Sequence, residues 1–280
     1  MADLLQEMRN VLIEAGRSVR TANSYLSHIR RLTRTFGDSV TGLTHAQLES
    51  YFNALLEERK SLSYINQAQS AIRFLYTEVL KKADPLPESG LPSRGLPLHG
   101  VFTREEISSI IGNTEDIRYR LALMLVYSSG LRVGEAACLL LAGIDRKAMV
   151  IHVNSRGGSH VRDTILARSA ESTLDQYLRT RSAESPFLFP GRGRKSCISA
   201  RTIQRAFSES LAAAGVDRHA TLGWLRHSFA VHLLEDGVDR KLLQRLLGVS
   251  TPSMMTPYVK LAVGRGPLRI MSPMDRFMTR

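Results

Sequence analysis

Residues 225–237 read LRHSFAVHLLEDG, and this stretch decides how the chain is interpreted. Leu225 and Phe229 recur at helical spacing and Gly237 follows as a stop, so the pattern predicts an amphipathic helix. Arg226 lies among these apolar positions. A guanidinium keeps its charge and grips two phosphate oxygens at once, so an arginine in this setting favours phosphate chemistry.

Two further features extend this interpretation along the chain. Residues 129–135 read SGLRVGE and place Arg132 in a second apolar setting. Downstream, Tyr258 follows Gly248 by ten residues, and a tyrosine hydroxyl can attack phosphorus and later leave it. The alternative is that these residues have structural roles. Buried charges are usually paired, so Arg132 would form an ion pair with Glu135, which lies one turn away. Tyr258 would then be a packing residue of the core.

The composition fits a globular protein that binds a polyanion. The chain has 280 residues, enough for two domains, and 43% of them are hydrophobic. Lysine and arginine outnumber the acidic residues by 38 to 26, which gives a net charge of +12. We expect nucleic acid rather than a membrane surface as the partner, because no basic amphipathic helix dominates the sequence. A basic protein without such a partner is the alternative, since charge alone does not specify binding.

Cysteine usage and the N-terminus bear on the compartment. The two cysteines, Cys138 and Cys197, suggest neither a disulfide framework nor a zinc site, and we expect no bound metal. The N-terminus has an early acid, Asp3, and no long apolar run, so it does not resemble a signal peptide. No stretch of about 18 apolar residues occurs in the sequence. These features predict a cytoplasmic protein.

Residues 1–83 predict an all-helical domain. Apolar residues recur at helical spacing in four segments, with stop or cap signals such as Gly16, Gly37 and the capping box that begins at Thr44. Four amphipathic helices in this length predict a small bundle. It carries many cations, which form either a solvated basic face or a clamp on DNA phosphates: Arg17, Arg20, Arg30, Arg31, Arg34, Arg59 and Lys60.

Prolines and glycines separate this region from the rest of the chain. Residues 84–100 hold four prolines and three glycines, which predicts an exposed linker. Residues 101–280 form the second predicted domain, which opens with another capping box at Thr103. Most of its apolar patterns are helical, including a helix from about Val133 to Leu140.

Strand signals in the second domain are short. Residues 150–153 and 164–166 are rich in β-branched residues and flank a Gly157-Gly158 turn, which predicts a hairpin. The sequence therefore predicts a mainly α fold. It consists of an N-terminal four-helix domain and a mainly helical second domain with a small β-hairpin or sheet.

With these motifs in this order, the chain resembles the tyrosine recombinases of the phage-integrase family, nearest to integron-type and Xer-like integrases. Residues 129–135 closely match the family's first-arginine motif, and residues 225–234 closely match its second. Residues 18–25, SVRTANSY, resemble the family's core-binding domain, and residues 272–275, SPMD, resemble the tails of integron-type integrases. The resemblance covers essentially the whole chain.

The resemblance implies a reaction and an assembly. Tyr258 would attack a DNA phosphodiester, form a 3′-phosphotyrosyl bond and free a 5′-hydroxyl, and the hydroxyl of another strand would reverse the step. Arg132 and Arg226 would hold the non-bridging oxygens and stabilise the transition state. No cofactor and no metal are required. The resemblance also implies double-stranded DNA as the partner and a tetramer on two duplexes, built from this chain alone or with a companion recombinase.

Three positions depart from the family pattern and put catalytic competence in question. Gly223 stands where the family has a histidine, and Val249 stands where it has a histidine or tryptophan. The hairpin lysine that acts as general acid aligns with Arg156 when the turn glycines set the register, and with Gly157 when the count runs back from Arg162; we prefer Arg156. In place of a lysine the hairpin offers only Arg156, His160 and Arg162, and a guanidinium is a poor proton donor. General acid–base groups typically contribute about 100- to 10,000-fold in rate, so we expect a slow or partner-assisted enzyme. His227 or His219 could take over proton handling.

Three functions stay open at this point. The first is a site-specific recombinase or integrase that cuts and rejoins duplex DNA. The second is a catalytically degenerate DNA-binding subunit that acts with an active partner recombinase, and the third is a topoisomerase-like enzyme that nicks and relaxes DNA. The apolar residues between 268 and 278 either dock on a neighbouring subunit or cap the chain's own fold.

Overall fold

The computed structural model describes residues 2–86, 100–154, 160–181, 184–193, 196–218, 220–249, 255, 258 and 272–278. The chain divides into two units, Met1–Pro97 and Leu98–Arg280, and each has its own core of buried apolar side chains. Of the predicted linker, only residues 84–86 and 100 are described, and the Gly157-Gly158 turn lies outside the described residues. Within the described ranges, no helix combines the length and the apolar character that crossing a membrane requires.

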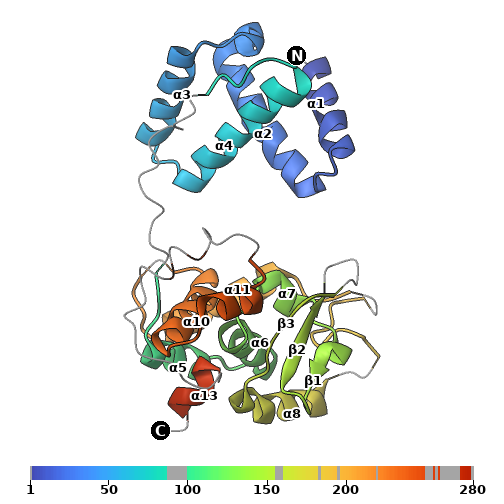
Figure 1. Ribbon diagram of the computed structural model, residues 1–280, viewed down its shortest axis with the longest axis vertical. Helices are drawn as coiled ribbons and strands as arrows, with labels where there is room; N and C mark the ends of the chain where they lie inside the picture. Colours follow the sequence, from blue (N-terminus) through green and yellow to red (C-terminus); the bar gives the residue numbers. More distant parts are fainter. Residues whose placement is uncertain are drawn as a thin grey trace. The chain divides into compact units, whose positions relative to one another are not determined.

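Helices build the first unit (Figure 1). They are α1 (Ala2–Glu14), α2 (Val19–Phe36), α3 (His45–Glu57) and α4 (Leu62–Phe74), with a 3₁₀ turn η1 (Gly37–Thr41) after α2 and a π turn η2 (Leu75–Val79) after α4. The capping box predicted at Thr44 is present, because Thr44 and Gln47 each accept a hydrogen bond from the other's backbone amide. Helix α2 packs against both α1 and α4. The predicted N-terminal helical domain is confirmed over residues 2–79.

The second unit is built around a buried helix. Its helices are α5 (Arg104–Gly112), α6 (Ile117–Ser128), α7 (Val133–Ala137), α8 (Glu171–Thr180), α9 (Ala200–Ala213), α10 (Gly223–Glu235), α11 (Arg240–Leu247) and α13 (Pro273–Met278). Every residue of α6 from Leu121 to Ser128 is buried, and α6 contacts α5, α7, α8, α9, α10 and α13. A helix that is apolar on all sides belongs in the interior, and Figure 1 shows α6 between α10 and the strands.

A small antiparallel sheet lies at one side of the second unit (Figure 1). Its described strands, β1 (Ile144–Asp145), β2 (Val150–Asn154) and β3 (His160–Ile165), are ordered β1-β2-β3. The predicted hairpin is therefore confirmed as β2 and β3. Strand β1 was not predicted, because two residues are too few for a periodic signal. Ile151 and Val153 of β2 are buried opposite Thr164 and Arg162 of β3, so these four side chains share the inner face.

Helix α7 is shorter than the sequence predicts. It ends at Ala137, and Leu139 and Leu140 leave the helix to pair with the segment around Phe187. The Leu188 amide donates to the Leu139 carbonyl at 2.7 Å. The apolar spacing of this segment is compatible with either structure, and the pairing with a distant segment decides between them.

The cysteine prediction is wrong, because Cys138 and Cys197 form a disulfide with their Cα atoms 5.1 Å apart. Cys138 is the C-cap of α7, and Cys197 pairs with Pro190 in an isolated β-bridge. The two residues are separated by 59 positions, so no local pattern in the sequence could have shown that they meet.

Reducing this disulfide is expected to lower the free energy of unfolding by about 2–4 kcal/mol, because the cross-link restricts the unfolded chain. Urea unfolding with and without reductant measures the change. Titration of thiols in the denatured protein must accompany it, so that the oxidation state of both cysteines is known in each sample. A variant with Cys138→Ala and Cys197→Ala should unfold identically in both conditions. Equal stability of the oxidised and reduced wild-type protein would contradict the prediction.

The end of the chain packs against its own unit where the structure describes it. Ser272 donates from its hydroxyl to the Ser128 carbonyl at 2.8 Å. The Asp275 carboxylate accepts the backbone amides of Arg168 and Ser169, and Met274 is buried. Residues 272–276 are therefore an intramolecular cap. Residues 268–271 and the side chains of 277 and 278 lie outside the described residues.

Candidate active site

One carboxylate, that of Glu135 in α7, joins three arginines of the second unit. Its Oε1 accepts hydrogen bonds from Nη1 of Arg132 and Nη1 of Arg162, both at 2.7 Å. Its Oε2 accepts Nη2 of Arg162 at 2.8 Å and lies 3.7 Å from Nη1 of Arg226. We call Glu135 and these three arginines the arginine cluster. Burial alone would raise the pKa of Glu135, but hydrogen bonds from Arg162 and from the Arg132 backbone lower it to about 2.

The C-terminal end of α11 holds the same three arginines. Carbonyls at a helix C-terminus lack intrahelical partners and carry partial negative charge, so they attract cations. Three successive carbonyls accept from one guanidinium each: Leu246 from Arg162 Nε at 2.8 Å, Leu247 from Arg226 Nη2 at 2.6 Å, and Gly248 from Arg132 Nη2 at 3.2 Å. The arginine cluster is thus fixed on one side by Glu135 and on the other by the end of α11.

Two glycines permit this close approach. Gly130 has a φ of +62°, and a Cβ there would lie 2.5 Å from the Phe229 ring. Gly248 has a φ of +60°, and a Cβ there would lie 2.6 Å from Cδ of Arg162. Both positions combine left-handed backbone with a lack of space, so only glycine fits. The Gly130 carbonyl accepts a hydrogen bond from Nη1 of Arg226 at 2.6 Å.

Tyr258 lies beside the arginine cluster. Nδ1 of His227, in α10, is 3.0 Å from the Tyr258 hydroxyl, and the two rings are 5.6 Å apart between centroids. Burial raises the pKa of Tyr258, and the charges of Arg226 and Arg132 act in the opposite direction. The phenol is therefore within electrostatic reach of both predicted phosphate-binding arginines. The structure brings Arg132, Arg226, Tyr258 and His227 together.

Positive charge is crowded around Arg226. Burial lowers its pKa, and repulsion from Arg132 and Arg162 lowers it further, to about 10, although Glu135 opposes the shift. Arg226 stays charged at neutral pH. A bound dianionic or monoanionic phosphate would relieve this repulsion, because its charge is opposite to that of the cluster.

The substituted family positions have different surroundings. Gly223 is the first residue of α10 and is exposed, and a Cβ there would lie 3.9 Å from Nε2 of His227. Val249 is partly buried against the core, and its amide donates to the Gln244 carbonyl at 3.2 Å. Neither side chain can transfer a proton. Arg156 and His219 lie outside the described residues.

Arg162 is the site residue that sequence reasoning missed. The hairpin drew attention to it only as one of several cations. Its side chain is 5% exposed and makes a bidentate ion pair with Glu135. A signal was available, because strand alternation places Arg162 on the same face as Thr164, toward the core. Arg162 holds Glu135 and α11 in place.

In the first unit, four of the seven candidate DNA-binding cations lie on α2, namely Arg20, Arg30, Arg31 and Arg34. Arg20, Arg30 and Arg34 are exposed, and at helical spacing all four positions fall within an arc of roughly 100°. Arg31 is different, because its guanidinium is bonded to the Glu58 carboxylate. The exposed arc is suited to contact with a polyanion.

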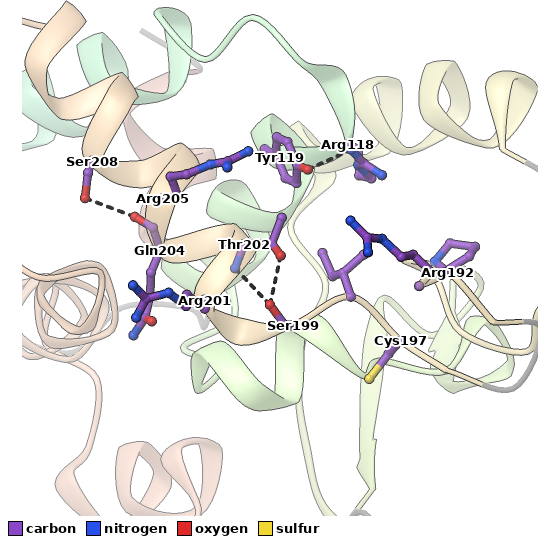
Figure 2. Close-up of a pocket in the computed structure, with 13 residues that line it drawn as sticks. Arg118, Tyr119, Arg192, Cys197, Ser199, Arg201, Thr202, Gln204, Arg205 and Ser208 are labelled. Atoms are coloured by element: carbon purple, nitrogen blue, oxygen red, sulfur yellow. Dashed lines mark hydrogen bonds between the residues drawn. The ribbon is translucent and has the colours of Figure 1, made fainter.

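A second basic feature of the second unit surrounds the N-terminus of α9 (Figure 2). An open pocket there is lined by Arg118, Arg192, Arg201 and Arg205. The hydroxyl of Ser199 caps α9 by accepting the Thr202 amide at 3.1 Å. A helix N-terminus flanked by guanidinium groups attracts phosphate, so the charge of this pocket is suited to an anion.

Comparison with known proteins agrees with this geometry. Residues 101–265 match the phage integrase family, and residues 4–85 match the N-terminal SAM-like domain of phage integrases. The chain belongs to the phage integrase family. It is 30% identical to tyrosine recombinase XerD of Caulobacter vibrioides over 86% of this chain and 82% of that protein. It is 33% identical to tyrosine recombinase XerA of Thermococcus kodakarensis over 93% of this chain and 92% of that protein.

Solved structures share the fold. A lambda integrase dimer bound to a core site matches with a TM-score of 0.74 and 20% identity, covering 96% of this chain and 98% of that chain. A lambda integrase tetramer bound to a Holliday junction matches with a TM-score of 0.70 and 20% identity, covering 89% and 77%. The mainly helical architecture with its small sheet is therefore that of the integrases.

Proposed function

We propose that this chain is a site-specific DNA recombinase that cuts duplex DNA through a 3′-phosphotyrosyl bond to Tyr258 and rejoins it to another strand. One observation carries the proposal. Arg132 and Arg226 share Glu135 and the end of α11, and Tyr258 lies within reach of both charges. Two fixed guanidinium groups beside one hydroxyl are what in-line attack on a phosphodiester requires.

The arginines act by holding the phosphate. Arg226 uses two of the five N–H groups of a guanidinium in its bonds to the Gly130 and Leu247 carbonyls, so donors remain for phosphate oxygens. The Arg132 side chain is 47% exposed, which leaves one side of it accessible to DNA. Each is expected to stabilise the charge of the transition state, by about 3–4 kcal/mol for one such donor.

Proton transfer is assigned to His227 and to solvent. As Tyr258 attacks phosphorus, its proton passes to Nδ1 of His227, which is already at hydrogen-bond distance. The P–O5′ bond breaks, and the 5′-oxygen takes up a proton from water. Arg156 is proposed to steady that oxygen as a hydrogen-bond donor only, because a guanidinium keeps its proton. Without the histidine at 223 and the lysine at 156, we expect slow turnover.

The first unit and the pocket at α9 complete the DNA contacts in this proposal. We assign residues 1–83 as a DNA-clamping domain, residues 84–100 as a linker and residues 101–280 as the catalytic domain. Arg20, Arg30 and Arg34 would contact phosphates. Because XerD and XerA are tyrosine recombinases and lambda integrase assembles as a tetramer on a Holliday junction, we propose a tetramer on two duplexes. The protein would act in the cytoplasm, where that DNA is.

A nicked substrate tests the proposal. A nick next to the cleavage point lets the short leaving strand diffuse away, so the phosphotyrosyl intermediate accumulates as a covalent protein–DNA adduct. Strand exchange between two labelled duplexes then identifies a recombinase, whereas loss of supercoils without exchange identifies a topoisomerase-like enzyme. DNA binding without any adduct would instead identify a degenerate subunit, one in which the substitutions at Gly223 and Val249 have removed cleavage altogether.

The arginines on α2 allow a separate test of DNA binding. Replacing Arg30 and Arg34 with alanine is expected to weaken binding about equally for all sequences and to reduce the slope of log affinity against log salt by about 1 for each lost contact. Arg31→Ala is the control, because its guanidinium is already paired with Glu58 and should contribute less. Fluorescence anisotropy between 50 and 200 mM salt, roughly the range over which such effects are large, gives both quantities. An unchanged slope in the double variant would remove α2 from the interface.

A further inference from the structure

The outer face of the β2–β3 hairpin carries a cluster of ligand-type side chains that the recombination chemistry does not use. His152 lies on β2, and His160 and Asp163 lie on β3. Oδ1 of Asp163 is 2.7 Å from Nδ1 of His152 and 2.8 Å from Nε2 of His160. The three side chains are between 42% and 56% exposed, so solvent and ions reach them.

Backbone register brings these residues together on one face. His152 pairs with Asp163 across the strands, and Asn154 pairs with His160 after an irregularity between Val153 and Asn154. Arg162 points to the opposite, inner face and bonds to Glu135. The cluster of His152, His160 and Asp163, which we call the hairpin triad, therefore lies on the far side of the sheet from the arginine cluster.

We propose that the hairpin triad binds a divalent transition metal ion, with Zn²⁺ as the representative ion. Two imidazole nitrogens and one carboxylate oxygen form a three-ligand set that suits zinc, with the fourth position left to water. The ligand atoms all lie within 4.8 Å of one another. Zinc bonds of about 2.0–2.2 Å would require the contacts to Oδ1 to open by about half an ångström, which exposed side chains permit.

Metal binding would link β2 to β3 on either side of residues 155–159. The inference goes beyond the recombinase function and does not depend on it, because it rests on different residues and on a different face. It also differs from the expectation drawn from the sequence that the chain holds no metal. From the sequence, His160 is only one of three candidate groups on the hairpin and His152 has no assigned role, because the ligand set forms only when two strands pair.

Isothermal titration of the full-length, tag-free, EDTA-treated protein with ZnCl₂ tests the proposal. We expect one ion bound per chain. Asp163→Asn and His160→Ala are each expected to reduce the affinity by about tenfold or more, since even residues that only support metal ligands contribute about 10- to 100-fold. His45→Ala is the matched control, because His45 is an exposed histidine of the other unit, and its affinity should equal that of the wild type.

A spectroscopic measurement separates loss of a ligand from loss of fold. Co²⁺ in place of Zn²⁺ gives visible absorption bands when a histidine–carboxylate set holds it, and Asp163→Asn should lose these bands while its circular dichroism stays that of the wild type. Zinc should also raise the melting temperature of the wild type but not of a variant with both His152→Ala and His160→Ala. A titration without a one-to-one isotherm overturns the proposal, as does one that Asp163→Asn and His160→Ala leave unchanged.

Discussion

Replacing Tyr258 with phenylalanine is expected to abolish the covalent adduct with nicked DNA and to leave DNA affinity unchanged. Phenylalanine keeps the ring that packs beside His227 and removes only the hydroxyl that His227 contacts at 3.0 Å. Without that oxygen no bond to phosphorus can form at this position. Enzymes that lose a nucleophile typically lose at least about 10⁴-fold in rate, so the adduct should fall below detection in a gel assay.

The control for this variant is Tyr177→Phe. Tyr177 belongs to the same unit, and its hydroxyl donates to the Leu188 carbonyl at 3.1 Å rather than to the arginine cluster. This variant should form adduct at the wild-type rate. Digestion of the wild-type adduct followed by mass spectrometry should place the nucleotide on the peptide that contains Tyr258. An adduct that persists in Tyr258→Phe, or that maps to another peptide, would show that this tyrosine is not the nucleophile.

Replacing Glu135 with glutamine is expected to destabilise the second unit by about 3–5 kcal/mol and to suppress cleavage as well. The change leaves the buried guanidinium of Arg162 without its counter-charge, and breaking a buried ion pair by removing one partner has effects of this size. Glutamine has nearly the same shape and can still accept hydrogen bonds, so the loss of stability measures the effect of removing the negative charge. Urea unfolding at neutral pH measures the change in the free energy of unfolding.

Two further variants make this result interpretable. Glu209→Gln removes an exposed carboxylate that lies 3.5 Å from Arg205, and it should change stability by no more than about 0.5 kcal/mol. Combining Glu135→Gln with Arg162→Met removes both buried charges, so the double variant should be less destabilised than the sum of the two single changes. Strict additivity would show that the two residues do not interact as the geometry indicates.

The stability that Glu135 provides should also depend on pH. Its pKa is lowered from 4.5 to about 2 in the folded protein, which corresponds to about 3 kcal/mol. Because the folded pKa lies below the unfolded one, this stabilisation is complete above pH 4.5 and is lost as the pH falls toward 2. The difference in stability between wild type and Glu135→Gln should shrink over that window. A constant difference would contradict the ion pair.

Most of the fold could be predicted because its signals are local. The capping boxes at Thr44 and Thr103, and the glycine that ends α11, each mark a helix boundary within a few residues of the place where the structure has it. The β2–β3 hairpin follows from alternation within short segments. The features that were missed depend on segments far apart in the chain. Helix α7 stops early because residues 139 and 140 pair near Phe187, and the disulfide joins residues separated by 59 positions.

The residues of the candidate site also divide into those with a local sequence signal and those whose role depends on distant segments. The positions of Arg132, Arg226 and Tyr258 stood out from motif strings, and the alternative that Glu135 pairs with Arg132 is also present in the structure. Strand alternation places Arg162 on the inner face, but its partners could not be read from the sequence, because the contacts with α7 and α11 form only in the folded protein. Whether these residues carry out cleavage stays a prediction for the experiments above.

The three consecutive carbonyls at the end of α11 set limits on how this chain can diverge. A mutation that moves the backbone at Gly248 would displace the carbonyl that Arg132 bonds to, and it would shift the Arg162 side chain, which packs against Gly248. The next residue, Val249, directs no hydrogen bond to a guanidinium in the described structure, so its identity could change while the arginines kept their places. A lineage that keeps the arginine cluster and the end of α11 together can therefore lose the side chains that transfer protons one at a time. The rate of catalysis and the affinity for phosphate could then change independently under selection.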